Sequence, residues 1–203
     1  TLNFDHRPAL GKADFLIADC NRGAAALIDC WPNWSSPTLA IHGPAGCGKS
    51  HLAEVFCRRA EARRLTHDAL ADDEARDPAE ADGAWVVEDA DVYLQAGPPA
   101  PLFHLFNQVC EGGGSLFLSG RSPPSRWSFD LADLRSRLNA MTAVAIGPPD
   151  DGVLAAVLVK LFADRQLRVG TEIIDFVLKR MERSFGAARD LVIEIDKIAL
   201  DQR

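Results

Sequence analysis

The feature that most constrains the fold of this chain is a glycine-rich segment, GPAGCGKS, which runs from Gly43 to Ser50. It follows a compact apolar run at 38–43 that predicts a buried strand. It precedes a stretch from Ser50 to Arg64 whose apolar residues are spaced as on one side of a helix. A glycine loop between a strand and a helix presents successive backbone N–H groups and a helix N-terminus to a bound phosphate. The segment therefore predicts an α/β protein that binds a nucleotide.

The positions within this segment have separate expected roles. Its spacing satisfies the pattern G-x-x-x-x-G-K-[ST], in which the lysine reaches the β- and γ-phosphates and the last hydroxyl is a ligand of Mg²⁺. Lys49 and Ser50 hold these two positions. The predicted nucleotide-binding residues of this region are Gly43, Pro44, Ala45, Gly46, Cys47, Gly48, Lys49, Ser50 and His51.

Further apolar runs alternate with helical patterns as far as residue 147. Buried strands are predicted at 84–89, 115–120 and 142–147, and an amphipathic helix at 101–113. Strands that alternate with helices predict a parallel sheet with helices on both faces. The stretch 61–83 is rich in Ala, Asp and Glu, and we expect it to be a solvated connection with room for one edge strand and one helix.

The pattern changes to helices alone after Pro148 and Pro149, with Thr171 as the expected N-cap of the second helix. The three predicted helices are 150–165, 171–182 and 186–201. The expected domains are an irregular N-terminal arm at 1–14, an α/β base at 15–147 and a helical lid at 148–203.

Composition excludes several classes of protein. The chain has 22 Lys and Arg residues and 29 Asp and Glu residues, which gives a net charge of -7. A protein of this charge does not present the overall basic surface that is typical of nucleic-acid-binding proteins. No apolar run approaches the roughly 20 residues that cross a membrane. The five cysteines form no C-x-x-C pair or zinc pattern, which predicts reduced thiols and a cytoplasmic protein.

Acidic side chains stand at the end of the strand predicted at 84–89. A nucleotide site needs an acidic group at the end of a neighbouring strand, where it holds Mg²⁺ directly or through water. Glu88 and Asp89 are therefore candidate Mg²⁺ ligands and catalytic residues, and Asp91 follows them. The other interpretation is that a strand end is acidic simply because it meets water.

Six segments extend this picture: DFLIADCNRGAAALI, GPAGCGKSHLAE, VVEDAD, LFLSGRSPP, LADLRSRL and GAARDL. Their order and spacing resemble those of the AAA+ ATPase module of the bacterial replication initiator DnaA, over nearly all of 1–203. The likeness is greatest to the short DnaA paralogues of the Hda group, which inactivate the initiator. The resemblance implies an AAA+ P-loop NTPase fold, a parallel sheet flanked by helices with a small C-terminal three-helix lid.

The resemblance also implies roles for residues outside the phosphate loop. Arg137, the second arginine of DLRSRL, would be an arginine finger that acts in trans on the ATP of a neighbouring subunit, and Arg189 would be the sensor arginine of the lid. A guanidinium keeps its charge and binds phosphate oxygens in a fork, although most helical surface arginines are merely solvated. The residues expected to enclose the adenine of ADP or ATP are Phe15, Leu16, Ile17 and Asn21.

The chain also departs from the family pattern. Glu88 stands where the initiator has an aspartate, and Gly120, in the sequence Ser119-Gly120-Arg121, stands where the family has an acidic or amide sensor. Glycine has no side chain with which to orient a water. Both changes favour a protein that holds nucleotide and hydrolyses it slowly. No helix-turn-helix domain follows the lid, so sequence-specific DNA binding is not expected.

The resulting hypothesis is a regulator of replication initiation that promotes hydrolysis of DnaA-bound ATP while tethered to the DNA polymerase sliding clamp. TLNF, from Thr1 to Phe4, resembles the end of a clamp-binding peptide, with apolar Leu2 and Phe4 at alternate positions. Self-association through AAA+ contacts is a further expectation. Two alternatives remain open: an AAA+ adaptor or loader for another replication protein, and a self-sufficient P-loop ATPase or kinase.

Overall fold

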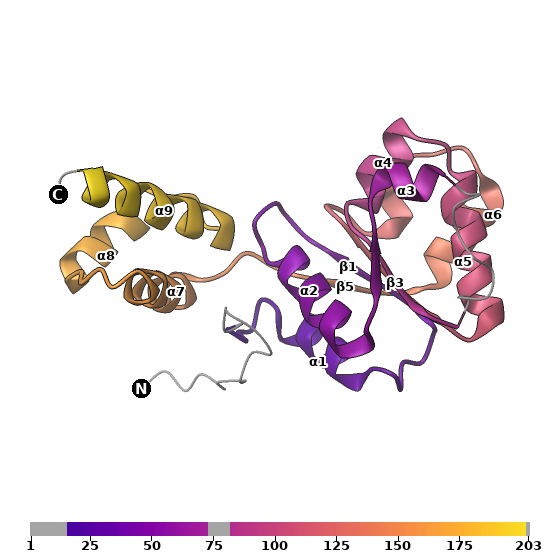
Figure 1. Cartoon of the computed structure of the whole chain (residues 1–203), viewed down its shortest axis with the longest axis horizontal. Coiled ribbons are helices and arrows are strands. Elements are labelled where there is room, and N and C mark those ends of the chain that lie inside the picture. The colour runs from indigo at the N-terminus through magenta and orange to yellow at the C-terminus, as the bar shows by residue number, and fades with distance from the viewer. Residues whose placement is uncertain (1–15, 73–81, 202–203) are drawn as a thin grey trace. The chain divides into compact units, whose positions relative to one another are not determined.

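The computed structural model describes residues 16–72 and 82–201 (Figure 1). The chain divides into two compact units. The sheet unit comprises Gly23–Gly43 and Lys49–Ile146. The helical unit comprises the described part of Thr1–Arg22, Pro44–Gly48 and the described part of Gly147–Arg203. Phe15 and the segment from Thr1 to Phe4 lie outside the described residues, so the clamp-peptide hypothesis stays a prediction.

The sheet has five parallel strands in the order β2-β3-β4-β1-β5. The strands are β1 (Thr38–His42), β2 (Arg63–Leu65), β3 (Ala84–Val87), β4 (Ser115–Gly120) and β5 (Thr142–Ala145). Apolar side chains bury the three central strands almost completely, as expected for a sheet covered on both faces. The predicted parallel α/β sheet is thus confirmed.

Helices flank this sheet. They are α1 (Arg22–Cys30), α2 (Lys49–Ala60), α3 (His67–Ala71), α4 (Ala90–Ala96), α5 (Ala100–Gly112) and α6 (Ala132–Ala140), with a 3₁₀ turn, η3 (Pro124–Arg126). Successive side chains of β4 point to opposite faces of the sheet. Phe117 stacks on Phe56 of α2 with ring centroids 5.6 Å apart, whereas Leu116 and Leu118 join the core cluster that contains Leu105 of α5.

Three local predictions differ from the structure. The helix expected as far as Arg64 ends at Ala60, because Glu61 adopts a left-handed conformation with φ 49° and turns the chain into β2. Helix α4 was not predicted. Thr171 is not an N-cap: Gly170 occupies that position with extended backbone, and Thr171 is the first helical residue.

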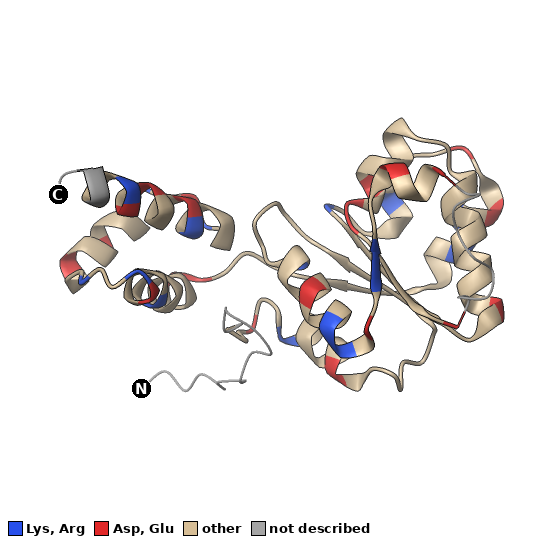
Figure 2. Cartoon of the chain, viewed as in Figure 1, with Lys and Arg blue, Asp and Glu red and all other residues tan. Residues whose placement is uncertain are grey.

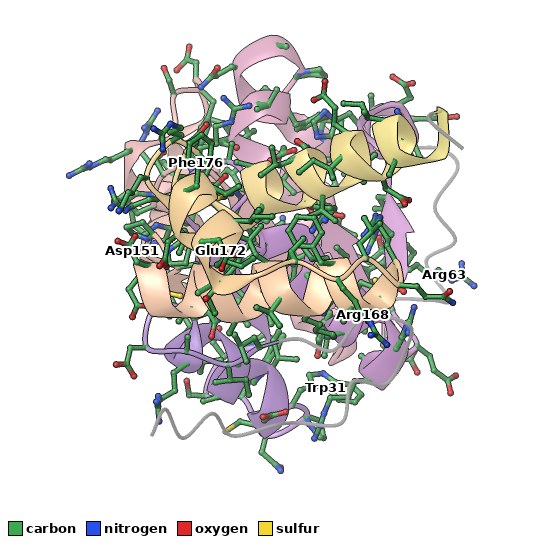
Figure 3. All side chains as sticks on the ribbon, turned by 90° about the vertical axis from the view of Figure 1, so that its left-hand side faces the viewer. Trp31, Arg63, Asp151, Arg168, Glu172 and Phe176 are labelled. Atoms are coloured by element: carbon green, nitrogen blue, oxygen red, sulfur yellow. The ribbon has the colours of Figure 1, made fainter. Side chains whose placement is uncertain are left out.

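The helical unit contains α7 (Asp151–Asp164), α8 (Thr171–Leu178) and α9 (Phe185–Asp201), which agrees with the predicted three-helix region. Their apolar sides pack into a core formed by Leu154, Leu158, Phe162, Ile174, Ala188 and Val192. Asp151, labelled in Figure 3, forms an ion pair with Arg183, and the Arg183 Nε lies 2.8 Å from the Asp151 Oδ1.

Two features of the described helices are the distribution of their charged residues and their apolar length. Basic and acidic residues are interspersed along the described helices (Figure 2). Among the described residues, no helix combines the length and apolar character needed to cross a membrane.

Candidate nucleotide-binding site

The phosphate loop connects β1 to α2. Gly46 and Gly48 have φ values of 69° and 105°, a left-handed region in which side chains other than hydrogen are disfavoured. Lys49 is only 8% exposed, and its Nζ donates a hydrogen bond to the Gly43 carbonyl at 2.9 Å. The Gly43 N–H in turn donates to the Gly120 carbonyl at 3.1 Å. The sequence spacing therefore corresponds to a folded loop with its lysine directed back across it.

The other loop residues differ in exposure. Cys47 is buried, Gly48 and His51 are half-buried, and Ser50 is exposed at the second position of α2. The exposed group also includes Pro44, Ala45 and Gly46. An exposed hydroxyl at the start of this helix is accessible to a metal ion or a phosphate.

Asp89 follows β3 in a left-handed conformation with φ 48° and ψ 44°. Its N–H donates to the Oγ of Ser119, a buried residue of β4, at 3.1 Å, while the Asp89 residue itself is exposed. Aspartate tolerates this conformation better than most residues, and such backbone strain is concentrated at functional sites. Ser119 thus holds the backbone that presents the Asp89 carboxylate.

Glu88 has a different environment from Asp89. Its side chain is 21% exposed, and its Oε1 lies 3.3 Å from Nη1 of Arg64 on β2. The Glu88 carbonyl is 2.9 Å from Nε2 of His67. Of the two candidate metal-binding carboxylates, Glu88 is therefore engaged by a cation of the chain itself.

The donors Ser50, Glu88 and Asp89 fit Mg²⁺ in their chemistry, because all three offer oxygen. In the described ranges, no group of three or more His, Cys, Asp or Glu side chains is arranged to hold a metal ion. Mg²⁺ in nucleotide sites typically has one or two protein ligands and takes its others from phosphates and water. The donor set therefore suits an ion that arrives with a nucleotide. Ser50 makes no hydrogen bond to either carboxylate within the described part of the chain.

The described part of the expected adenine-binding segment, 16–21, is shaped by Asn21. This side chain is 1% exposed, its Oδ1 accepts from the Ala18 N–H, and its Nδ2 donates to the Leu16 carbonyl, both at 2.9 Å. Both ends of the amide are thus used to fold the segment, with half-buried Leu16 and Ile17 beside it. Burial raises the pKa of the Cys20 thiol, which favours the neutral form.

Arg189 lies on α9 in the helical unit and is exposed. Within the same unit, the Gly186 N–H donates to the Gly46 carbonyl at 3.1 Å. A Cβ on Gly46 would lie 3.0 Å from the Gly186 nitrogen, so this approach requires glycine. Sequence reasoning missed Gly186, although the glycine of GAARDL was the available signal. Arg189 follows it by three residues, which is about one helical turn.

The two arginines of DLRSRL have different surroundings on α6. Arg135 donates hydrogen bonds to the carbonyls of Trp127 and Phe129, so its guanidinium is used inside the sheet unit. Arg137 is exposed, and its guanidinium lies 5.4 Å from the ring centroid of Phe103. In the part of the chain that the structure describes, Arg137 makes no ion pair or hydrogen bond through its side chain.

Gly120 lacks a side chain for a packing reason. A Cβ there would lie 2.8 Å from Cζ2 of Trp127 and 3.2 Å from Cγ of Asp91. Trp127 is 2% exposed and donates from Nε1 to the Ser122 carbonyl at 2.8 Å. The indole thus fills the space that a polar sensor side chain would need.

Comparison with known proteins places these features in a wider context. No protein-family model matches the chain. The chromosomal replication initiator protein DnaA of Thermomicrobium roseum is 26% identical over 193 residues, which cover 83% of this chain and 41% of that protein. The chain therefore spans about two-fifths of the length of this relative.

Solved structures of DnaA share the fold. Domain III of Thermotoga maritima DnaA matches with a TM-score of 0.77 at 19% identity, covering 93% of this chain and 89% of that one. AMPPCP-bound DnaA from Aquifex aeolicus matches with a TM-score of 0.74 at 18% identity, covering 91% and 64%. The expected AAA+ P-loop fold is confirmed, whereas the narrower likeness to the Hda group stays a prediction. The chain thus has the AAA+ P-loop fold and is similar in sequence to the replication initiator DnaA.

Proposed function

We propose that this chain binds an adenine nucleotide, ADP or ATP, together with Mg²⁺. The observation that carries the proposal is the phosphate loop between β1 and α2, with left-handed Gly46 and Gly48 and the buried Lys49. The Aquifex aeolicus DnaA of similar fold is bound to AMPPCP, an adenine nucleotide analogue, which supports the choice of ligand.

In this proposal different residues contact the phosphates, the adenine and the metal ion. The Lys49 ammonium, which now donates to the Gly43 carbonyl, would exchange this neutral acceptor for phosphate oxygens, with which its hydrogen bonds are stronger. Leu16, Ile17 and the loop that Asn21 folds would contact the adenine. Arg189 would supply a second cation to the phosphates. Bound Mg²⁺ would neutralise phosphate charge, with Ser50, Glu88 and Asp89 as its protein-side donors.

The same residues favour retention of nucleotide over rapid hydrolysis. Fast turnover needs a group that positions the attacking water, and Trp127 occupies the space beside Gly120 where such a group would project. Glu88 is engaged by Arg64. The isolated chain is therefore proposed to hydrolyse ATP slowly.

The wider role that we propose is regulation of replication initiation. In this proposal Arg137 stimulates hydrolysis of ATP bound to DnaA, and the segment from Thr1 to Phe4 attaches the chain to the sliding clamp in the cytoplasm. Support comes from the sequence similarity to DnaA and from the two arginines of α6, since Arg137 is exposed whereas Arg135 is bound to carbonyls of its own unit. An arginine finger has to be exposed in this way to reach a neighbour.

Two variants test the two levels of this proposal in one set of assays. Lys49→Ala should weaken ADP binding by at least about tenfold in calorimetry, because a charge-assisted hydrogen bond to phosphate is lost. Arg137→Ala should bind ADP like the wild type. It should nevertheless lose stimulation of DnaA-bound ATP hydrolysis with DNA-loaded clamp present, an effect of about 10³ to 10⁵ for other arginine fingers.

Arg137→Lys and Arg135→Ala serve as controls. Lysine should rescue little, because a point charge does not reproduce the planar fork. Arg135→Ala should lower the melting temperature yet retain stimulation in the folded fraction. Equal ADP affinity of the wild type and Lys49→Ala would refute nucleotide binding through this loop. Full stimulation by Arg137→Ala would refute only the regulatory role.

A further inference from the structure

Arg64 lies between two carboxylates from different elements. Its Nη1 is 3.3 Å from Oε1 of Glu88 after β3, and its Nη2 is 3.1 Å from Oε2 of Glu54 on α2. Arg58 binds the same Glu54, with its Nε 2.7 Å from Oε1. Arg64 is thus the arginine of this cluster that contacts a candidate Mg²⁺ ligand.

The cluster also lies on the side of α2 that carries Ser50. Residues four positions apart share one face of a helix, so Ser50 and Glu54 are neighbours on α2. The preceding residue of β2, Arg63, is labelled in Figure 3. Successive side chains of a strand point to opposite faces, and the Arg63 guanidinium lies 5.7 Å from the Trp85 ring centroid. Of the two adjacent arginines, Arg64 therefore places its charge near the candidate metal donors.

A guanidinium and Mg²⁺ compete for the same carboxylate. An Mg²⁺ ion that uses Glu88 must either displace Arg64 or bind close to its positive charge, and both oppose binding. The Arg64 and Glu88 side chains are 41% and 21% exposed, so solvent screens their ion pair and keeps it weak enough to exchange. Such a pair lowers metal affinity without abolishing it.

We propose that Arg64 is a positioning residue that holds Glu88 in an ion pair and so weakens the dependence of nucleotide binding on Mg²⁺. The inference rests on the proposed nucleotide binding and adds a residue that sets its response to the metal. With Arg64 in place, Mg²⁺ improves nucleotide binding less than it would if the Glu88 carboxylate were unpaired. Removal of the Arg64 charge releases Glu88 to the metal.

The test compares the dissociation constant of ADP in EDTA with that in excess Mg²⁺, by calorimetry on the full chain. The dissociation constant in EDTA divided by that in excess Mg²⁺ is the magnesium enhancement, which exceeds one when Mg²⁺ strengthens ADP binding. Arg64→Gln should raise this enhancement about three- to tenfold, while affinity in EDTA stays within about twofold of the wild type. Arg64→Lys should remain close to the wild type, because it keeps the charge. Thermal melting checks that each variant is folded.

Two further variants separate this role from a general effect of surface charge. Arg58→Gln removes an arginine that shares Glu54 but does not contact Glu88, and it should leave the enhancement unchanged. Glu88→Gln, added to Arg64→Gln, should abolish the gain, since the gain acts through this carboxylate.

Each contrary result has a distinct meaning. An unchanged enhancement in Arg64→Gln, an equal gain in Arg58→Gln, or a gain that survives Glu88→Gln would overturn the inference and leave nucleotide binding intact. A wild-type chain that binds no ADP under either condition would refute the proposed function, and this inference would fail with it.

Discussion

Replacement of Gly120 by alanine should destabilise the protein although it adds only one methyl group. The new Cβ would lie 2.8 Å from Cζ2 and 3.1 Å from Cε2 of Trp127, closer than well-packed carbon atoms approach. The indole is 2% exposed and tied to the Ser122 carbonyl, and Asp91 blocks another direction at 3.2 Å. Because overpacking of a filled core costs about 1 to 3 kcal/mol, we expect the free energy of unfolding to fall by that amount.

Gly23→Ala is the matched control, since its Cβ would lie 3.5 Å from Cγ2 of Val144, an ordinary contact. Gly23 is in helix α1, where alanine should stabilise by about 0.5 to 1 kcal/mol. Urea denaturation followed by far-ultraviolet circular dichroism measures the free energy of unfolding of both variants. The two can be compared directly when this free energy has the same dependence on urea concentration in each. Opposite signs are expected. If Gly120→Ala is as stable as the wild type, the assignment of Trp127 as the reason for this glycine is wrong.

Two further predictions concern stability. Burial and then the charge of Arg126 lower the pKa of His42, so the unfolded chain, with its ordinary histidine pKa of about 6.5, takes up protons more readily as the pH falls. The wild type should therefore lose stability below about pH 6.5, and His42→Gln should lose less of it in urea titrations across that range; parallel curves would contradict this. Asp150 Oδ1 accepts the Val153 N–H at 2.8 Å and caps α7. Asp150→Ala should cost about 1 kcal/mol by the same assay, and no change would exclude a contribution from this cap.

The elements that could be predicted from sequence are those whose signal is local. The central strands are continuous apolar runs because both of their faces are covered, and such runs are visible without a partner. Helix α2 was predicted four residues too long because Glu61, which ends it, adopts a left-handed conformation without the glycine that usually marks one. Thr171 failed as an N-cap because threonine also suits the first turn, and only the backbone conformation distinguishes the positions.

The candidate site shows the same limit. The phosphate loop was predictable because its eight residues are contiguous and the four fixed positions of its pattern each have a defined chemical role. The contacts of Glu88 with Arg64 and of Gly120 with Trp127 join residues from separate elements. Sequence alone shows the two departures, Glu88 and Gly120, but not the residues that accompany them.

These accompanying residues change how the departures should be interpreted. If Gly120 were a simple loss of a sensor, restoring an acidic side chain there would restore its function, but Trp127 occupies that space. If Glu88 were a simple exchange for aspartate, shortening it would suffice, but a shorter carboxylate would also draw back from Arg64, which binds Glu54 as well. Each departure is therefore one member of a pair of contacting residues. A single substitution, of Glu88 by aspartate or of Gly120 by an acidic residue, should disturb the charge pairing or the packing and should not by itself speed hydrolysis. The proposed slow hydrolysis is therefore tested with paired substitutions, which change Trp127 with Gly120 or Arg64 with Glu88.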